Sequence, residues 1–192
     1  MIKIAILVSG NGTNAENIIK YFANNKNIEV SIVMSNKKDA YGLTRARNLN
    51  IATGYFNREE FTNGTTLRQF EQLGINWIIL AGFLWLVPDI ILNQYDGRIV
   101  NIHPSLLPKY GGKGMYGDKV HEAVVANHDK ESGITIHTID QHYDEGKTVF
   151  QATCQVLPTD NAHDVATKVH ALEYEWFPRV IEKLVMNEKI EF

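Results

Sequence analysis

Short apolar runs alternate with amphipathic segments in the first half of the chain, and this alternation is the strongest constraint on the fold. Residues 4–8 form a continuous apolar run that ends at a glycine-rich turn, and residues 15–25 follow with a helical stripe of apolar side chains. A continuous apolar run is typical of a parallel strand covered on both faces. Strands that alternate with helices predict βαβ units and a doubly wound, parallel sheet.

The alternation continues along the chain and then changes. Further strands are predicted at 28–34, 51–55, 77–81 and 98–101, and further helices at 41–48 and 67–73. Later segments predict a helix at 118–127, strands at 134–138 and 148–157 with a turn at 143–147, and one long amphipathic helix starting at 158–160. We therefore expect an α/β, Rossmann-like fold with a mostly parallel mixed sheet, flanked by helices and ending in a long C-terminal helix.

Composition limits the class of protein. The 192 residues fit a single domain, 1–192, and a net charge of -3 with 44% hydrophobic residues describes an ordinary globular chain without a basic nucleic-acid surface. The one cysteine, Cys154, excludes an internal disulfide and agrees with a reducing, cytoplasmic location. The N-terminal strand is too short for a signal peptide and the run 77–88 too short for a membrane span. We expect small-molecule substrates, no nucleic-acid or membrane partner, and a monomer or weak homodimer.

A glycine-rich loop, Ser-Gly-Asn-Gly-Thr-Asn at residues 9–14, lies between the first strand and the first helix. Backbone N–H groups and the positive helix end at such a loop can hold an anion, so a phosphate is the expected ligand. A tight turn without a ligand is the alternative. The loop also fits the GxGxxA dinucleotide pattern, but residues 35–38 read SNKK where NAD binding requires an acidic residue. NAD is therefore disfavoured, and NADP stays open.

The segment NIHPSLLPKY, residues 101–110, follows another buried strand. Asn101 and His103 lie two positions apart, so both side chains point to the same side of a strand, and the prolines turn the chain out of the sheet. A lone histidine at a strand end is often structural. If the turn at 143–147 brings Asp144 beside His103, an acid–base group with an amide donor for an oxyanion results, which suits acyl transfer. A metal at His103, His137, His142 and Asp144 is conceivable, but no HxxxH or HExxH spacing is present and no metal is expected. His137 lies on a predicted strand with alternating residues, and the pattern leaves open which face of the sheet it occupies.

These segments together resemble the glycinamide ribonucleotide transformylases, the folate-dependent formyltransferases of purine biosynthesis, over nearly the whole chain. Residues 9–14 are similar to the family's phosphate loop, Leu-Ala-Gly-Phe at 80–83 to its folate-side segment, NIHPSLLP at 101–108 to its active-site signature, and Asp-Glu-Gly at 144–146 to its aspartate loop. The resemblance implies transfer of a formyl group from 10-formyltetrahydrofolate, as co-substrate, to the amine of glycinamide ribonucleotide. No metal or covalent intermediate is implied.

The resemblance also assigns roles by position. Residues 1–100 would form the nucleotide-binding half, and residues 101–192 the catalytic and folate-binding half. The catalytic residues would be Asn101, His103 and Asp144. The ribonucleotide would be bound by Gly12, Thr13, Asn14 and Glu173. The folate would be bound by Arg58, Leu84, Trp85, Leu86, Val87 and Asn101.

Two segments depart from the family pattern. Trp85 stands where many members carry an arginine, which removes a charge near the folate tail. Residues 110–117 read YGGKGMYG, a glycine-rich loop in place of the commoner proline- and histidine-containing one.

The active-site signature at 101–108 also occurs in methionyl-tRNA formyltransferase, formyltetrahydrofolate hydrolase and sugar N-formyltransferases. From the chain length we expect neither the extra C-terminal domain of the first nor the extra N-terminal domain of the second. A non-catalytic folate- or nucleotide-binding module is the remaining alternative.

Overall fold

The computed structural model describes residues 1–192 and divides into two compact units, Met1–Asn101 and Ile102–Phe192. The first unit contains β1 (Ile2–Val8), α1 (Thr13–Phe22), β2 (Ile28–Ser35), α2 (Tyr41–Asn48), β3 (Thr53–Tyr55), α3 (Arg58–Thr62), α4 (Thr65–Leu73), β4 (Trp77–Leu80) and α5 (Asp89–Gln94). β5 (Ile99–His103) begins in the first unit and ends in the second. The second unit continues with α6 (Asp118–Ala126), β6 (Glu131–Thr138), β7 (Thr148–Gln155) and α7 (Ala162–Val185).

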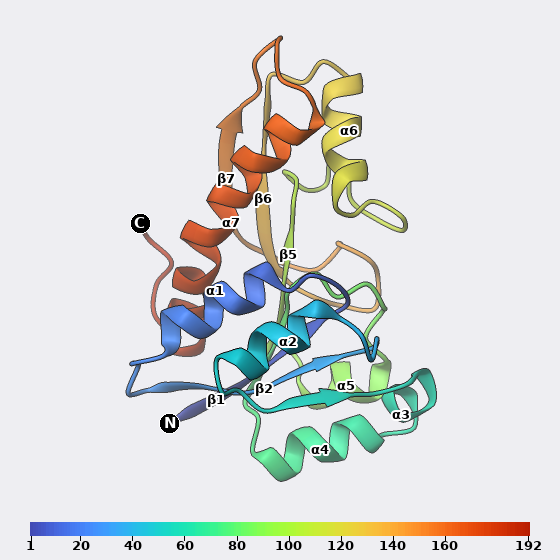
Figure 1. Ribbon diagram of the computed structural model, residues 1–192, viewed down its shortest axis with the longest axis vertical. Helices are drawn as coiled ribbons and strands as arrows, with labels where there is room; N and C mark the ends of the chain where they lie inside the picture. The colour runs from blue at the N-terminus through green and yellow to red at the C-terminus, as the bar shows by residue number, and fades with distance from the viewer. The chain divides into compact units, whose positions relative to one another are not determined.

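The first unit is doubly wound, as the alternation predicts. Its strands follow the order β3-β2-β1-β4-β5, and every pairing among them is parallel. Figure 1 shows α1 and α2 on one face of these strands and α4 on the other. Residues 4–8 of β1 are completely buried, which explains why the run carries no polar residue. The chain winds in opposite directions from the neighbouring strands β1 and β4.

The second unit is built on an antiparallel hairpin of β6 and β7, with Glu131 opposite Gln155 and His137 opposite Thr148. α7 lies along this hairpin and contacts α6 (Figure 1). Parallel pairs in the first unit and an antiparallel pair in the second confirm the predicted mixed, mostly parallel α/β fold with its long C-terminal helix. α7 begins at Ala162, two residues after the predicted start at 158–160, because its N-cap is Asn161, which forms a reciprocal capping box with Asp164.

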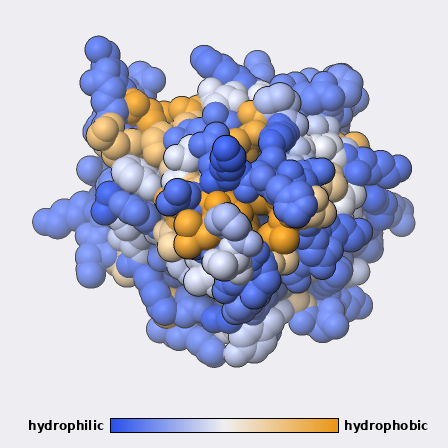
Figure 2. Space-filling view, turned by 90° about the horizontal axis from the view of Figure 1, so that it is seen from above, coloured by the Kyte–Doolittle hydropathy of each residue, from blue (hydrophilic) through white to orange (hydrophobic).

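Polar side chains dominate the face drawn in Figure 2, with apolar side chains gathered in small patches between them. No helix of the chain is long and apolar enough to cross a membrane. The large apolar side chains instead form the buried core of each unit.

Candidate functional site

The glycine loop after β1 is closed against the start of α2. Gly12 has φ +72°, and a Cβ atom there would lie 2.4 Å from the Cα atom of Gly42. The Gly42 N–H donates to the Gly10 carbonyl at 3.0 Å. Gly12 is also the N-cap of α1 and has no side chain that could bond the first amides of the helix. The loop is therefore suited to present these amides to an anion.

Ser9 joins this loop to the segment that follows β4. Its N–H donates to the Gly82 carbonyl at 3.0 Å, and its hydroxyl donates to Asn36 Oδ1 at 2.7 Å and accepts from the Leu84 N–H at 3.0 Å. Ligands of open α/β sheets bind at the carboxyl ends of the strands where the winding reverses. The predicted phosphate loop and the predicted folate-side segment thus meet at the switch point of the first unit.

The predicted folate-side residues lie around an aromatic cluster. The guanidinium of Arg58 stacks over the ring of Trp85, 4.1 Å from its centroid, a favourable cation–π geometry. Trp85 contacts the buried rings of Phe56, Phe61 and Phe83 edge-on or tilted. Arg58 is therefore held over the ring of Trp85.

The remaining residues of this segment differ in exposure. The side chains of Leu84 and Leu86 are each 39% exposed, whereas Val87 is buried. Leu84 and Leu86 can therefore offer side chains to a ligand, and Val87 only its main chain.

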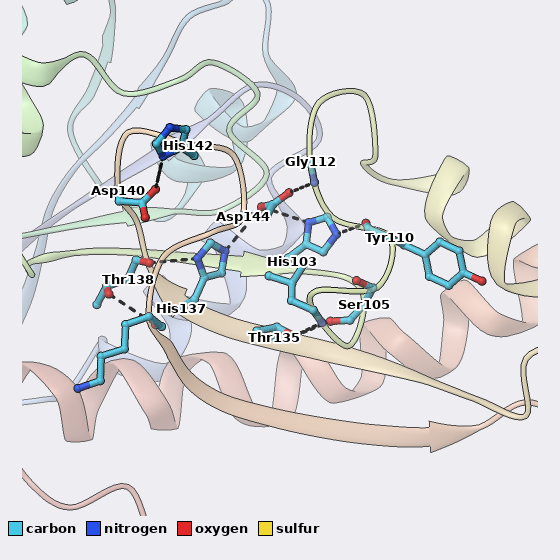
Figure 3. Close-up of polar contacts among 12 residues, drawn as sticks. His103, Ser105, Tyr110, Gly112, Thr135, His137, Thr138, Asp140, His142 and Asp144 are labelled. Atoms are coloured by element: carbon cyan, nitrogen blue, oxygen red, sulfur yellow. Dashed lines mark hydrogen bonds and ion pairs between the residues drawn. The ribbon is translucent and has the colours of Figure 1, made fainter.

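His103 ends β5 with both ring nitrogens engaged (Figure 3). Its Nε2 lies 2.7 Å from the carbonyl oxygen of Tyr110. A carbonyl oxygen only accepts, so Nε2 carries the hydrogen. Nδ1 lies 3.5 Å from Oδ1 of Asp144. The side chains of His103 and Asp144 are only 5% and 11% exposed, so this contact is shielded from water.

Asp144 is held by three contacts at the turn between β6 and β7. Its Oδ2 accepts a hydrogen bond from the Gly112 N–H at 2.9 Å, and its Oδ1 also lies 3.7 Å from Nε2 of His137. Asp144 has φ +59°, a left-handed conformation that aspartate tolerates better than most residues. The structure thus brings Asp144 beside His103, as the sequence analysis requires for an acid–base pair.

His137 is the residue whose orientation the sequence left open, and it faces Asp144. Its Nδ1 donates to the Thr138 carbonyl at 3.1 Å, which leaves Nε2 toward the carboxylate. Burial, more than any other influence, lowers the pKa of His137. A neutral His137 therefore stands on one side of Asp144 and His103 on the other.

The hydroxyl of Thr135 fixes the loop that follows His103. It donates to the Ser105 carbonyl at 2.7 Å and accepts from the Leu107 N–H at 2.9 Å and from Gln151 Nε2 at 2.8 Å. Gln151 also donates to the Leu107 carbonyl at 3.1 Å. Three hydrogen bonds on one buried hydroxyl make Thr135 the main anchor of this loop on the hairpin.

Replacing Thr135 by valine is expected to lower the free energy of unfolding by about 3 kcal/mol, because a buried carbonyl and a buried N–H lose their partner at about 1–3 kcal/mol each. Serine keeps the hydroxyl and is expected to lose no more than about 1 kcal/mol for the missing methyl group. Urea unfolding of both variants measures the difference. Equal stability of the valine and serine variants would remove the hydroxyl from this role.

The carbonyl of Tyr110 bonds His103, and the side chain of Tyr110 is held by separate hydrogen bonds. The phenol donates to Asp129 Oδ2 and accepts from Asn127 Nδ2, each at 2.8 Å. Lys109 Nζ lies 2.6 Å from Asp129 Oδ1 and lowers the pKa of that carboxyl. The start of the glycine-rich loop is therefore anchored, and the motif patterns in the sequence give no sign of this contact with His103.

Glu173 lies on α7 in a second polar cluster of this unit. It is 4% exposed, and its Oε2 lies 2.9 Å from Nδ1 of His170. The hydrogen bond to Glu173 raises the pKa of His170. The ring of His121, on α6, lies 6.2 Å from that of His170, and its buried Nδ1 has no hydrogen-bond partner. Burial, and then the charge of His170, lower the pKa of His121.

Acid is expected to destabilise the protein through His121. Its pKa in the folded state lies below the ordinary 6.5, so the unfolded state binds more protons as the pH falls below that value. The contribution of His121 to the free energy of unfolding is fully present above pH 6.5. It is lost on acidification, at a rate of at most about 1.4 kcal/mol per pH unit. Three titratable groups face the ring: Asp118, His170 and Glu173.

Urea unfolding between pH 5 and 7 checks this expectation. A His121→Phe variant should show a smaller loss of stability on acidification than the unmodified protein. His170→Gln is the opposite comparison: the pKa of His170 is raised, so removing this residue should not reduce the loss of stability on acidification. An unchanged slope in His121→Phe would show that His121 does not bind a proton on unfolding.

Asn101 lies two residues before His103 on β5, opposite Leu80 of β4. Side chains alternate along a strand, so Asn101 and His103 project from the same face of β5. His142, by contrast, pairs with Asp140 on the surface at 3.8 Å, away from the contacts of Asp144 in Figure 3. No group of three or more histidine, cysteine, aspartate or glutamate residues is arranged to hold a metal ion.

Known proteins share this fold and much of this sequence. The model of the formyl transferase family matches residues 2–181. A chloroplastic phosphoribosylglycinamide formyltransferase of Vigna unguiculata is 38% identical over 95% of the chain, which spans 60% of that relative's length. The phosphoribosylglycinamide formyltransferase of Haemophilus influenzae is 36% identical over 95% of this chain and 86% of its own.

A solved structure extends the similarity to the fold. The crystal structure of glycinamide ribonucleotide transformylase 1 from Symbiobacterium toebii matches with a TM-score of 0.88 and 29% identity, over 97% of this chain and 89% of its own.

Proposed function

Since the chain belongs to the formyl transferase family, we propose that it transfers the formyl group of 10-formyltetrahydrofolate to the amine of glycinamide ribonucleotide in de novo purine biosynthesis. The observation that carries the proposal is the buried contact of His103 with Asp144, 3.5 Å apart at the end of β5. An imidazole shielded beside a carboxylate is suited to acid–base work. We assign the protein to the cytoplasm, as a monomer or weak homodimer acting on small molecules.

Within one formyltransferase domain, each substrate would be bound by its own set of residues. The amides of Gly12, Thr13 and Asn14 would hold the phosphate, supported by the uncapped start of α1. Glu173 would contact the glycinamide part, supported by its burial beside His170. Leu84, Trp85, Leu86 and Val87 would line the folate pocket, and Asn101 would contact its formyl group.

Arg58 would hold the anionic tail of the folate. Its guanidinium already stacks over Trp85 at 4.1 Å, and such a stacked cation keeps its planar N–H donors free to bind a carboxylate at the edge. The charge that Trp85 removes from the family pattern is thereby supplied from α3.

The chemical step is a direct displacement at the formyl carbon. The neutral amine attacks this carbon, a new C–N bond forms, and the carbonyl electrons move to the oxygen. The Asn101 amide and the His103 imidazolium would donate to the oxyanion. Nε2 of His103 donates to the Tyr110 carbonyl at 2.7 Å in the free protein, so the formyl oxygen would replace that carbonyl as acceptor.

Collapse of the intermediate breaks the bond to N10 of the folate. The amine must lose one proton, and N10 must gain one. Asp144, which faces Nδ1 of His103, would orient the ring and relay the proton through water. The formyl group then ends on the glycinamide nitrogen, and tetrahydrofolate leaves without a covalent enzyme intermediate.

One assay tests the proposal. The purified protein is mixed with glycinamide ribonucleotide and 10-formyltetrahydrofolate, and the appearance of deformylated folate is followed. Turnover that requires the ribonucleotide is expected. Absence of turnover would reject the proposal, and equal turnover without the ribonucleotide would instead indicate a hydrolase.

A further inference from the structure

Arg45 of α2 reaches across to the glycine loop and holds Asn11 at two points. Its Nε donates to the Asn11 carbonyl at 2.9 Å, and its Nη2 donates to the Asn11 side-chain oxygen at 3.1 Å. Asn11 lies between Gly10 and Gly12, where the chain has few side chains to fix its path. A planar guanidinium that bonds both oxygens of one residue fixes its backbone and its side chain together.

The same guanidinium is paired with a carboxylate in the first turn of α1. Nη1 of Arg45 contacts Glu16 Oε2, and Lys20 Nζ contacts the other oxygen, Oε1, at 2.5 Å. Lys20 and then Arg45 lower the pKa of Glu16, which is therefore ionised at neutral pH. The Glu16 N–H bonds the Gly12 carbonyl at 3.0 Å, so this negative charge stands one helical turn from the amides that would bind a phosphate. Unpaired, it would repel the phosphate.

Arg45 is itself held in place. Its guanidinium stacks over the ring of Tyr41, 4.8 Å from the centroid, and the start of α2 is bonded to the loop through Gly42 and Gly10. The side chain of Arg45 is 26% exposed and that of Glu16 23%. The cluster is thus a fixed structure and differs from a flexible surface pair, which contributes little.

We propose that Arg45 is a positioning residue for the ribonucleotide phosphate. It fixes Asn11 and neutralises Glu16 beside the phosphate-binding amides. This role rests on the proposed function, because it assumes that residues 12–14 bind the phosphate. Three nitrogens of the guanidinium are already engaged by Asn11 and Glu16, so Arg45 acts through the loop.

The test compares Arg45→Gln with Arg47→Gln, a matched control on the same helix whose guanidinium bonds only Thr44. Steady-state rates are measured with glycinamide ribonucleotide and with glycinamide riboside, which lacks the phosphate. Arg45→Gln is expected to raise the KM for the ribonucleotide about tenfold, equivalent to about 1.4 kcal/mol. Three other constants of Arg45→Gln should change less than about twofold: the KM for the formyl folate, kcat, and the kcat/KM for the riboside. Every constant of Arg47→Gln should also change less than about twofold.

The Glu16→Gln change separates the two parts of the role. Alone it should leave the KM for the ribonucleotide unchanged or lower it, and in Arg45→Gln it should restore part of the lost affinity, because the repulsive charge is gone. Arg45→Lys keeps the charge but cannot bond both oxygens of Asn11, so an intermediate KM is expected. Arg45→Lys also provides the test if Arg45→Gln fails to fold.

Two results would overturn the inference, and they are distinguishable. If the unmodified protein prefers the ribonucleotide to the riboside but Arg45→Gln and Arg45→Lys keep its KM, Arg45 does not position the phosphate. If the unmodified protein uses riboside and ribonucleotide equally well, the phosphate loop itself is wrongly assigned and the inference fails with that part of the proposed function.

Discussion

Replacing Asp144 by asparagine is expected to leave the fold intact and to reduce kcat by about 10³-fold, within the range that a positioned acid–base group contributes. The asparagine side chain has the same shape, and its oxygen can still accept the hydrogen bond from the Gly112 N–H, now 2.9 Å from Oδ2. Its NH₂ group would then face Nδ1 of His103 and Nε2 of His137, where Oδ1 lies at 3.5 and 3.7 Å. The negative charge and the proton acceptor are lost together.

Single-turnover rates with both substrates, together with thermal unfolding, measure this effect. Asp140→Asn is the matched control, because Asp140 lies in the same loop, is about half exposed and contacts only the neighbouring His142. The control should keep its rate within about twofold. Near-normal turnover by Asp144→Asn would remove Asp144 from the mechanism, and a large loss of stability would show that its role is structural.

The sheet was predictable because its strands carry their own signal. The central strands β1 and β4 are buried over most of their length and appear in the sequence as apolar runs, whereas β2 carries Glu29 and Ser31 and the edge strand β3 has no buried residue. Two short helices gave no such signal. α5 has six residues, Asp89–Gln94, and only Ile91 is buried, while α3 has five, Arg58–Thr62, with only Phe61 buried. One buried side chain does not produce a periodic pattern.

The candidate site was only partly predictable, for a related reason. His103 and Asp144 were marked by motifs, but Thr135 and His137 lie on β6, where residues 132–137 are all buried. Residues 134–138 alternate apolar and polar side chains, which is typical of a strand with one face in water, but both faces of this part of β6 are buried. The β6–β7 register also shifts between Ile136 and His137. The orientation of His137 toward Asp144 therefore depends on tertiary packing and on this irregularity, and neither is encoded in a local pattern.

Replacing Gly146 by alanine is expected to disable the site without touching a reacting group. A Cβ atom at this position would lie 1.7 Å from the carbonyl oxygen of Thr138 and 2.9 Å from the Cα atom of Ile139. Both contacts are with backbone, which cannot rotate away as a side chain can. The turn that carries Asp144 must therefore move, at a cost of about 2–3 kcal/mol in the free energy of unfolding.

The movement acts on catalysis because Asp144 lies two residues before Gly146, and Thr138 closes the turn by donating to the Lys147 carbonyl at 3.0 Å. A displacement of about 1 Å of the carboxylate is enough to lower kcat about 10²-fold. Urea unfolding and steady-state kinetics measure the two effects. Glu145→Ala, an exposed change in the same turn, should alter neither by more than about 0.5 kcal/mol or twofold. Full activity in Gly146→Ala would mean that the turn relaxes while Asp144 stays beside His103, so the tight approach of Gly146 to Thr138 would not be what places the carboxylate.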